Sequence, residues 1–402
     1  MAGRTVVWPR GFKTAAVRAG IKASGAADVA LLAGEGECSA AAVFTRNRVV
    51  GAAVAVDREK IRSGRAQAIF VNSGNANTCT GRRGERDVHV ICREVGRRLG
   101  IGPERVLVCS TGIIGHYLPM GKVRAGIEAA TGPGGLRGTA AAGRAFARAI
   151  LTTDTREKTA WEAVVLGGRE VRLAGAAKGS GMIAPNMGTM LAFLTTDAAV
   201  RPGLLRRALG AAAQRTFNKV SVDNHVSTSD TAIVLASGRA GNRELARADG
   251  QYERFAAALT RVCDRLARQI AADGEGARCL VTVRATGAAS EAEARRAVRA
   301  IVGSPLVRCA FHGADPNWGR IVSAVGYSGA RFSPERLTCR VAGVRVFRGG
   351  RPRPFEAREL HRRMKAKEWE VQVDLGVGRS EDFCYTCDLS HGYVTINADY
   401  HT

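Results

Sequence analysis

The sequence predicts an α/β protein in which helices cover layered β-sheets. Short apolar runs rich in β-formers alternate along the chain with longer runs whose apolar residues recur at helical spacing. Apolar residues make up 46% of the 402 residues and aromatic residues only 5%, so we expect an interior built mostly of Ala, Val, Leu and Ile. A chain of this length has room for a large core and for two domains.

Several apolar runs near the start of the chain have the length and composition of strands. These are VALLAG at residues 29–34, AAVAVD at 52–57, QAIFVN at 67–72 and RVLVCS at 105–110. Longer segments that carry apolar residues at helical spacing, with arginines on the other face, predict helices. They span residues 86–99, 203–217 and 251–272.

A loop and a strand meet at the middle of the chain. Glycine, proline and asparagine residues break regular structure between Lys178 and Gly188. The apolar run Met190–Leu194 follows and has the length of a strand. Thr189 therefore lies at the junction of a loop and a predicted buried strand, and its hydroxyl is at the first position of that strand.

The second half of the chain continues the alternation. Strand-length apolar runs occur at residues 231–236, 279–285, 337–347, 371–375 and 393–398. Ser290 followed by Glu293 forms a capping box, which predicts a helix running to about Val302.

The composition changes at DGEG (273–276), directly after the last of the long helical runs. Glycine and acidic residues in such a stretch are typical of a connection between folding units. We therefore expect a first domain of residues 1–275 and a smaller α/β domain of residues 276–402.

The formal charge of +24 raises the question of a nucleic-acid partner, because a basic surface attracts nucleic acids, membranes and small anions alike. The 60 Lys and Arg residues are interleaved with 36 Asp and Glu residues, and the few aromatics do not suffice for base-stacking platforms. The basic segment RGGRPR (348–353) is short and isolated. We expect no nucleic-acid partner and interpret the charge as an attraction for anionic substrates; a basic nucleic-acid-binding protein is the non-enzymatic alternative.

Ten cysteines in a chain of this length do not make a disulfide scaffold and suit a reducing cytoplasm, where we place the protein. Cys384 and Cys387 have CxxC spacing, with His391 four residues later, but zinc sites usually need a second pair. We interpret the pair as structural and predict no metal. No apolar run approaches the ~20 residues needed to cross a bilayer, so we expect neither a membrane segment nor a targeting segment.

The sequence lacks the motifs of metalloproteases, P-loop proteins, dinucleotide-binding domains and α/β-hydrolases. His116 and His312, taken alone, are interpreted as structural. What remains is a set of Gly-rich polar loops after predicted strands, where sites are usually built. They are NSGNANTCTG (72–81), STGIIG (110–115), TTDT (152–155), residues 178–189, DGEG (273–276) and DPNWGR (315–320). Together they indicate a pocket of backbone amides, hydroxyls and side-chain amides.

These loops carry a resemblance to a known family. The blocks STGIIGHYLPM, KGSGMIAPNMGTMLAFLTTDA, DPNWGRI and the terminal YVTINADYHT resemble the ornithine acetyltransferase (glutamate N-acetyltransferase) family of arginine biosynthesis. The resemblance begins near Gly11–Phe12, keeps the same order and runs to Thr402. It implies an αββα fold of the N-terminal-nucleophile type for the first, catalytic domain, and a C-terminal tail that returns to the active site.

The resemblance also implies self-cleavage between Gly188 and Thr189, giving an α chain of residues 1–188 and a β chain of residues 189–402. The Thr189 hydroxyl would attack the Gly188 carbonyl, where glycine crowds the attacked carbon least. Cleavage then frees an α-amine with a pKa of about 7.7–8.0, which can act as a base beside the hydroxyl. The family more often has alanine before the threonine.

By the same resemblance, Thr189 is the nucleophile, and Thr111 and Gly112 form the oxyanion hole. The family's substrate-binding positions correspond to Thr152, Lys178, Thr189, Glu275, Asn397 and Thr402. Lys178 suits a substrate carboxylate and Glu275 a substrate ammonium.

The implied reaction moves an acetyl group from N2-acetylornithine to glutamate through an acetyl-threonine enzyme. No cofactor is expected, and acetyl-CoA as a second donor is left open. The implied assembly is a heterotetramer of two α and two β chains. A self-cleaving amidohydrolase or aminopeptidase of similar fold is the alternative enzyme.

Two segments depart from the family pattern. Ala277–Cys279 stands where the family usually has Ala-Thr-Lys, and VDNHVSTSD (222–230) puts His225 in an unusual place. Neither segment includes the expected nucleophile or oxyanion positions. We therefore expect any effect of these departures to fall on substrate choice.

Overall fold

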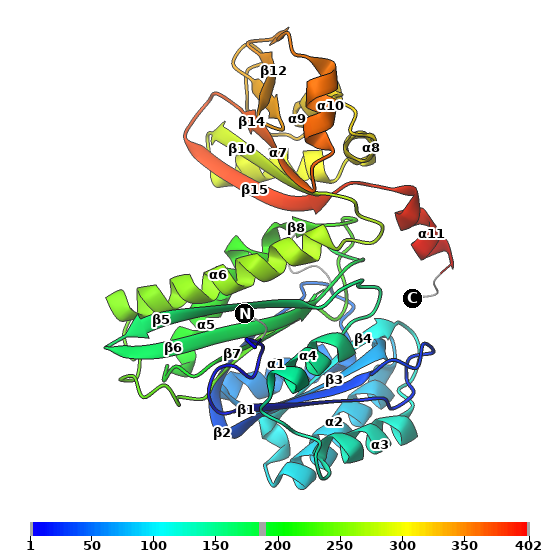
Figure 1. The fold of residues 1–402 in the computed structure, drawn as a ribbon, viewed down its shortest axis with the longest axis vertical. Helices are drawn as coiled ribbons and strands as arrows, with labels where there is room; N and C mark the ends of the chain where they lie inside the picture. The colour runs from blue at the N-terminus through cyan, green and yellow to red at the C-terminus, as the bar shows by residue number, and fades with distance from the viewer. Residues whose placement is uncertain (1–2, 185–189, 400–402) are drawn as a thin grey trace. The chain divides into compact units, whose positions relative to one another are not determined.

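The computed structural model describes residues 3–184 and 190–399 (Figure 1). These residues form two compact units, one of residues 3–218 and 225–270 and one of residues 219–224 and 271–399. The sequence had placed residues 219–224 and 271–275 in the first domain. The short segment 219–224 joins the second unit because two of its residues form a strand at the edge of that unit's sheet.

The first unit is built on an eight-stranded sheet in the described part of the chain. Its strands are β1 (Phe12–Val17), β2 (Val29–Phe44), β3 (Arg65–Asn75), β4 (Val106–Ile113), β5 (Lys158–Leu166), β6 (Arg169–Lys178), β7 (Leu191–Thr196) and β9 (Thr231–Ala236). The order is β4-β3-β2-β9-β7-β6-β5, and β1 pairs with β2. The pairs β3–β4 and β7–β9 are parallel, and the other neighbours are antiparallel.

The long strand β2 divides this sheet into two halves. Residues 29–33 and 38–39 pair with β3, with a register shift between Ala33 and Cys38, whereas residues 39–44 pair with β9. Buried residues from β1–β4 and from β6, β7 and β9 form one shared core. Phe146 and Phe193 meet there edge to face, with ring centroids 5.4 Å apart.

Helices cover the outer faces of both halves. They are α1 (Ala52–Lys60), α2 (Gly81–Leu99), α3 (Met120–Thr131), α5 (Pro202–Arg215) and α6 (Gly250–Ala272). Helix α4 (Ala140–Ala149) instead packs in the shared core through Phe146. Helices α1, α2 and α3 share a core with β3 and β4. On the other side, Leu266 of α6 lies so close to β6 that a Cβ on Gly175 would come within 2.9 Å of its Cδ1 atom. Figure 1 shows this succession of helices, two sheet layers and helices, which confirms the predicted αββα architecture.

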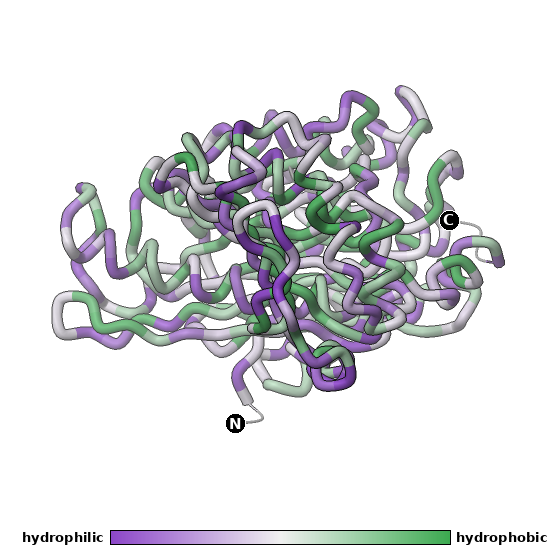
Figure 2. Tube along the Cα trace, turned by 90° about the horizontal axis from the view of Figure 1, so that it is seen from above, coloured by the Kyte–Doolittle hydropathy of each residue, from purple (hydrophilic) through white to green (hydrophobic). Residues whose placement is uncertain are grey.

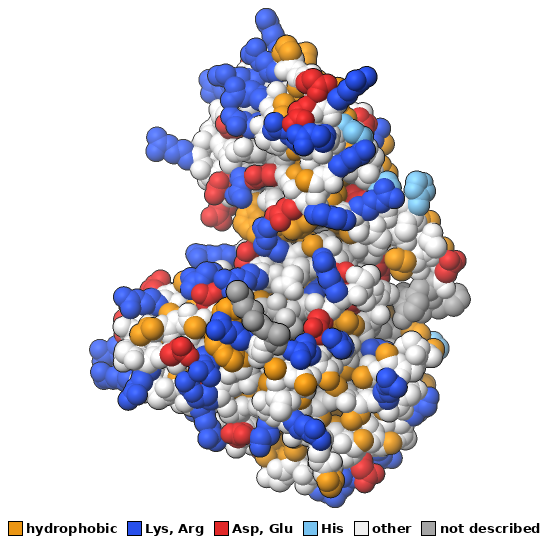
Figure 3. All heavy atoms as spheres, in the orientation of Figure 1, with side chains coloured by type: hydrophobic (Ala, Val, Ile, Leu, Met, Phe, Trp, Pro, Cys, Tyr) orange, Lys and Arg blue, Asp and Glu red, His pale blue; other side chains and the backbone are white. Residues whose placement is uncertain are grey.

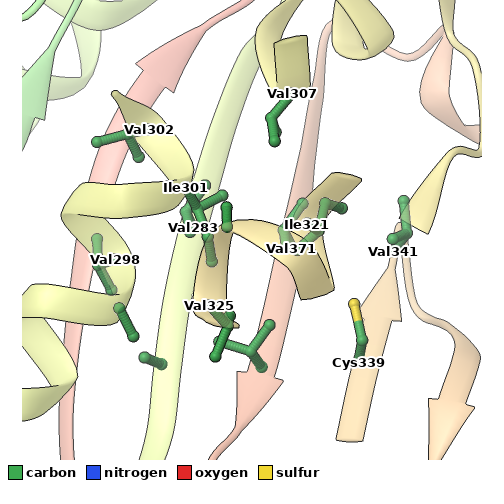
Figure 4. Packing of buried hydrophobic residues seen from close by; sticks show 14 of the residues in the cluster. Val283, Val298, Ile301, Val302, Val307, Ile321, Val325, Cys339, Val341 and Val371 are labelled. Carbon is green, nitrogen blue, oxygen red and sulfur yellow. The ribbon is translucent and has the colours of Figure 1, made fainter. Parts of the chain in front are cut away.

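The second unit holds a seven-stranded sheet in the described residues, in the order β13-β12-β11-β14-β10-β15-β8. Its strands are β8 (Val220–Ser221), β10 (Leu280–Ala288), β11 (Thr338–Val341), β12 (Val344–Arg348), β13 (Arg351–Pro352), β14 (Glu368–Asp374) and β15 (Ser380–Cys387). Its helices are α7 (Glu291–Val302), α8 (Pro305–Gly313), α9 (Trp318–Gly326), α10 (Ala357–Met364) and α11 (His391–Asp399). Figure 4 shows side chains of α7 and α9 gathered over β10 and β14, in the core of this unit.

Along the chain, hydrophobic and hydrophilic residues alternate over short distances (Figure 2). This is the pattern of elements with one buried and one exposed face. Among the described residues, no helix has both the length and the apolar content needed to cross a membrane.

Most predicted elements are confirmed within a few residues. The predicted helices correspond to α2, α5 and α6, and the predicted strand after Thr189 corresponds to β7. Half of the predicted capping box is present: Ser290 caps α7 by accepting a hydrogen bond from the Glu293 backbone amide at 3.3 Å, whereas the Glu293 carboxylate contacts Arg296 and Arg331. The run 337–347 is a hairpin of β11 and β12, whose turn residues Ala342 and Gly343 both have positive φ.

Two of the predicted strands are wrong, because they are helices. AAVAVD (52–57) lies in α1, since a short apolar run reads the same in a strand and in a buried helix, and alanine is the best helix former. Residues 393–398 lie in α11, although their β-branched residues favour a strand. The Ser390 hydroxyl accepts a hydrogen bond from the Tyr393 amide at 3.3 Å and so caps the first turn of this helix.

Candidate active site

Thr111 and Gly112 lie near the end of β4, where it runs parallel to β3. Gly112 pairs with Gly74 and has a φ of 132°. A Cβ atom on Gly112 would stand 2.3 Å from the Gly74 carbonyl carbon, so only glycine permits this approach. The oxyanion role of these residues stays a prediction, and the close approach is what gives their backbone its position.

The asparagines of the NSGNANTCTG loop hold the ends of β3 and β4 together. The Ser110 hydroxyl donates to the Asn72 side chain at 2.7 Å, and the Asn72 amide donates to the Asn75 carbonyl at 2.8 Å. The Asn75 amide in turn donates to the carbonyls of His116 and Tyr117, each at 3.2 Å. The loop next to Thr111 is therefore fixed by buried hydrogen bonds.

Lys178 ends β6 and is 3% exposed. Its ammonium donates a hydrogen bond to the Thr111 hydroxyl at 3.3 Å. The structure thus brings together two of the predicted site residues, which are 67 positions apart in the chain and come from opposite halves of the sheet.

Asp154 joins Lys178 to the TTDT loop. Its carboxylate accepts hydrogen bonds from the amides of Thr152 at 3.1 Å and Gly179 at 2.7 Å, and from the ammonium of Lys158 at 2.6 Å. The side chains of Asp154 and Lys158 are fully buried. Burial opposes ionisation of Asp154, but the charges of Lys178 and Lys158 outweigh it and hold the pKa of this carboxyl below its usual value.

Asp230 holds the backbone at the start of β7. Its carboxyl accepts a hydrogen bond from the Met190 amide at 3.0 Å, and the Met190 carbonyl accepts one from the Thr231 amide at 3.0 Å. Burial raises the pKa of Asp230 well above its usual value. Gly188, Thr189 and Thr402, three positions of the predicted site, lie outside the described residues.

In the second unit the structure brings Glu275 and Asn397 together. The Asn397 amide on α11 donates to the Glu275 carboxylate at 2.7 Å, and Glu275 is 5% exposed. The Ser390 hydroxyl donates to the Gly276 carbonyl at 2.7 Å, which ties the DGEG loop to the start of α11. These two predicted substrate-binding residues therefore share one hydrogen-bonded cluster within their own unit.

The departure at Ala277–Cys279 involves backbone contacts. The Asp388 carboxylate accepts hydrogen bonds from the amides of Arg278 at 2.7 Å and Cys279 at 3.1 Å. Its other oxygen contacts the Nδ1 atom of His312 at 2.7 Å. These bonds use the main chain of residues 278 and 279, and the buried Cys279 side chain also contacts Asp388 at 3.7 Å.

Cys384 and Cys387 lie in β15 and are buried. Burial raises the pKa of the Cys384 thiol to about 12 and that of Cys387 to about 11. Arg308 donates to the Cys387 sulfur at 3.5 Å and to its carbonyl at 2.9 Å. Metal independence stays a prediction.

Lysines and arginines spread over the face shown in Figure 3, with acidic side chains between them. Charged side chains in the described part of the chain form surface ion pairs, such as Arg105 with Glu37 at 2.7 Å and Arg265 with Glu162 at 2.8 Å. The described surface is therefore mixed in sign, as the interleaved sequence predicts.

Asp154 and Asp230 are the site residues that sequence reasoning missed. The sequence indicates TTDT as a site loop but gives its aspartate no role. Asp154 interacts with Lys158 and Lys178, and only the folded chain brings Lys178 close to it. Asp230 lay in a segment that was noted only for its departure from the family pattern.

Comparison with known proteins gives consistent matches. The model of the ArgJ family matches residues 13–402. The arginine biosynthesis bifunctional proteins ArgJ of Deinococcus radiodurans and Symbiobacterium thermophilum are 48% and 46% identical over 398 and 399 residues, which cover 99% of this chain and 98% of each relative. A crystal structure of the ArgJ protein of Bacillus halodurans is 41% identical with a TM-score of 0.51, and the match covers 53% of this chain and 100% of that one.

Proposed function

The chain belongs to the ArgJ family, and from that premise we propose that it transfers an acetyl group from N2-acetylornithine to glutamate in arginine biosynthesis. The observation that carries the proposal is the hydrogen bond between Lys178 and Thr111, two positions that the family resemblance assigns to substrate binding and to the oxyanion hole. The near-complete coverage of relatives named for arginine biosynthesis supports it.

Thr189 is the nucleophile of the proposed reaction. Its hydroxyl attacks the acetyl carbonyl carbon while its own α-amine takes the hydroxyl proton. The Thr111 hydroxyl and the Gly112 amide stabilise the oxyanion, and the nearby Lys178 ammonium polarises the Thr111 hydroxyl as a donor. The C–N bond then breaks, ornithine leaves with the proton, and the acetyl ester on Thr189 remains.

The second half-reaction reverses these roles. The amine of glutamate attacks the ester carbonyl, the Thr189 alkoxide leaves and recovers a proton, and N-acetylglutamate is released. Both substrates are amino acids, so one pocket serves both in turn. Lys178 is the polar group of the first unit that we assign to binding them.

The free α-amine of Thr189 requires self-cleavage. We propose that the Thr189 hydroxyl attacks the Gly188 carbonyl, the peptide C–N bond breaks as an ester forms, and water then releases the Gly188 carboxylate. Asp230 supports this step, since it fixes the amide of the next residue, Met190. The crystallised chain of the Bacillus halodurans protein matches 53% of this chain over its whole length, and residues 189–402 make up the same share.

The self-cleaving aminopeptidase or amidohydrolase is disfavoured, because the relatives that match over nearly the full length are biosynthetic proteins. Since they are named bifunctional, we also propose acetyl-CoA as a second donor for glutamate. We place the enzyme in the cytoplasm as two α and two β chains, without a metal or a tightly bound cofactor.

Self-cleavage is tested first, by intact mass. Wild-type protein should give fragments that end at Gly188 and begin at Thr189, and Thr189→Ala should stay one chain. Thr195→Val is the matched control, because it removes a hydroxyl of β7 that donates to the Val6 carbonyl, and it should still cleave. A fully active wild-type protein that remains uncut would refute the proposed mechanism.

A further inference from the structure

Lys22 lies in the loop between β1 and β2. The Asp28 carboxylate pins this loop by accepting hydrogen bonds from the amides of Ala19 at 2.7 Å, Ile21 at 2.5 Å and Lys22 at 3.0 Å. A loop held through its backbone by one buried carboxylate presents its side chains in defined positions.

The Lys22 ammonium is held at two of its donors. It donates to the carbonyls of Ala27 at 2.9 Å and of Ala149, the last residue of α4, at 3.1 Å. An ammonium has three N–H donors. Within the described residues, therefore, one donor of Lys22 is left for a ligand.

The stem of Lys22 packs against Gly74, the neighbour of Gly112 in the sheet. A Cβ on Gly74 would lie 3.1 Å from the Lys22 Cγ atom, and Gly74 is the residue that pairs with Gly112. The Ala149 carbonyl that holds the ammonium also accepts the Ser73 hydroxyl at 2.5 Å. Lys22 is thus tied to the same end of β3 that carries Gly74.

The charges around Lys22 favour the binding of an anion beside its ammonium. Burial lowers the pKa of Lys22 to about 8; Asp28 and Asp154 favour its charge, and the neighbouring Lys178 disfavours it. Lys22 and Lys178 therefore repel each other in a partly desolvated place. An anion that contacts both ammonium groups would relieve this repulsion.

We propose that Lys22 binds the α-carboxylate of the amino-acid substrate together with Lys178, beside Thr111 and Gly112. The inference rests on the proposed function, because that function supplies a carboxylate at every stage of the reaction. It adds to the site a residue that contacts substrate from the β1–β2 loop, and it gives the two lysines one shared ligand.

The test compares Lys22→Met, Lys22→Arg and the control Lys122→Met. Lys122 is exposed and donates to the Gly20 carbonyl of the same loop at 2.6 Å, so its loss perturbs the loop without removing the proposed contact. Appearance of both cleaved chains shows that each variant has folded and has a competent Thr189. Kinetics are measured with N2-acetylornithine and with its carboxamide, which lacks the carboxylate.

In Lys22→Met we expect KM for N2-acetylornithine to rise about 10- to 100-fold, the size of a lost hydrogen bond to a charged group, with kcat within about 3-fold. KM for the carboxamide should change little, so the ratio of the two KM values, which measures the preference for the acid, should approach one. Lys122→Met should match wild type. Unchanged KM in Lys22→Met, or an equal loss for acid and carboxamide, would overturn the proposal.

The pH profile separates binding from a merely structural role. In wild type, KM for N2-acetylornithine should rise as the pH passes about 8, because Lys22 loses its proton there. In Lys22→Arg, KM should stay low to higher pH, since arginine keeps its charge. A wild-type enzyme without transfer activity would refute the proposed function. The role of Lys22 is then decided by binding affinities, by comparing N2-acetylornithine with its carboxamide in both wild type and Lys22→Met.

Discussion

At the scale of the residue, Asp154 is the group on which the contacts of the first-unit site converge. It is buried with Lys158, it accepts the amides of Thr152 and Gly179, and Lys178 acts on it through charge. The family resemblance, and not residue type, pointed to Thr111 and Lys178. Their contact depends on the order of the strands in the sheet, which the sequence does not specify. A carboxylate whose partners are mostly backbone amides leaves no sequence signal at all.

Asp154→Asn should destabilise the protein by about 3–5 kcal/mol at pH 7, because it leaves the buried Lys158 ammonium without its counter-charge. The folded-state pKa of Asp154 lies below that of the unfolded chain, so its contribution is present above about pH 4 and is lost as the pH falls below that value. The difference between wild type and variant should therefore shrink in acid. Urea unfolding in the uncut Thr189→Ala background, where the chain stays in one piece, measures it.

Glu157→Gln is the matched control in the same loop. Glu157 forms an ion pair with Arg148 at 3.1 Å, and the Arg148 side chain is 68% exposed, so its loss should cost less than about 1 kcal/mol. Equal losses for the two variants, or a difference that does not vary with pH, would contradict the role given to Asp154.

At the scale of the element, the junction of loop and strand at β7 organises the site. Hydrophobic runs predicted β7 and β9 closely, and their parallel pairing places Leu191 opposite Thr231. Segments with mixed patterns were harder to predict. AAVAVD forms the helix α1, since a short apolar run does not separate a strand from a buried helix and its alanines favour the helix. The hairpin β5–β6 was not predicted. The Asp230 contact extends the β7–β9 pair backwards to Met190, which no periodicity indicates.

Asp230→Asn should stabilise the fold at neutral pH. Burial raises the folded-state pKa of this carboxyl above that of the unfolded chain, so its contribution to stability falls as the pH rises above about 4. Asparagine keeps an oxygen for the Met190 amide and avoids this loss, which amounts to about 1.4 kcal/mol for each unit of pKa difference. Melting temperatures across pH, again in the Thr189→Ala background, should show the advantage at pH 7 and its disappearance near pH 4.

Asp249→Asn is the control for this experiment. Asp249 is exposed and accepts the Gln251 amide at 3.0 Å at the start of α6, a role that asparagine fills equally well. It should show no pH-dependent difference. An Asp230→Asn variant that is less stable than wild type at pH 7 would mean that the carboxyl is ionised in the folded protein.

At the scale of the whole molecule, the sequence predicted an α/β chain with two units, and the structure divides it near residue 270, where the composition changes. The segment 219–224 escaped prediction because it joins the second unit through a two-residue strand, too short to have a pattern. The charge of +24 predicted neither fold nor site, since net charge bears on partners and solubility. The function was predicted from the resemblance of the loops, in their order along the chain, to a known family.

The measurement that tests the central claim most directly is acetyl transfer to the enzyme itself. N2-acetylornithine with a labelled acetyl group is given to the cleaved enzyme without glutamate, and the β chain is analysed by mass after rapid acid quenching. The label should be on the peptide that begins at Thr189, and adding glutamate should move it to N-acetylglutamate. Normal transfer with no labelled enzyme at any time would mean that the acetyl group passes directly between substrates, and Thr189 would not be its carrier.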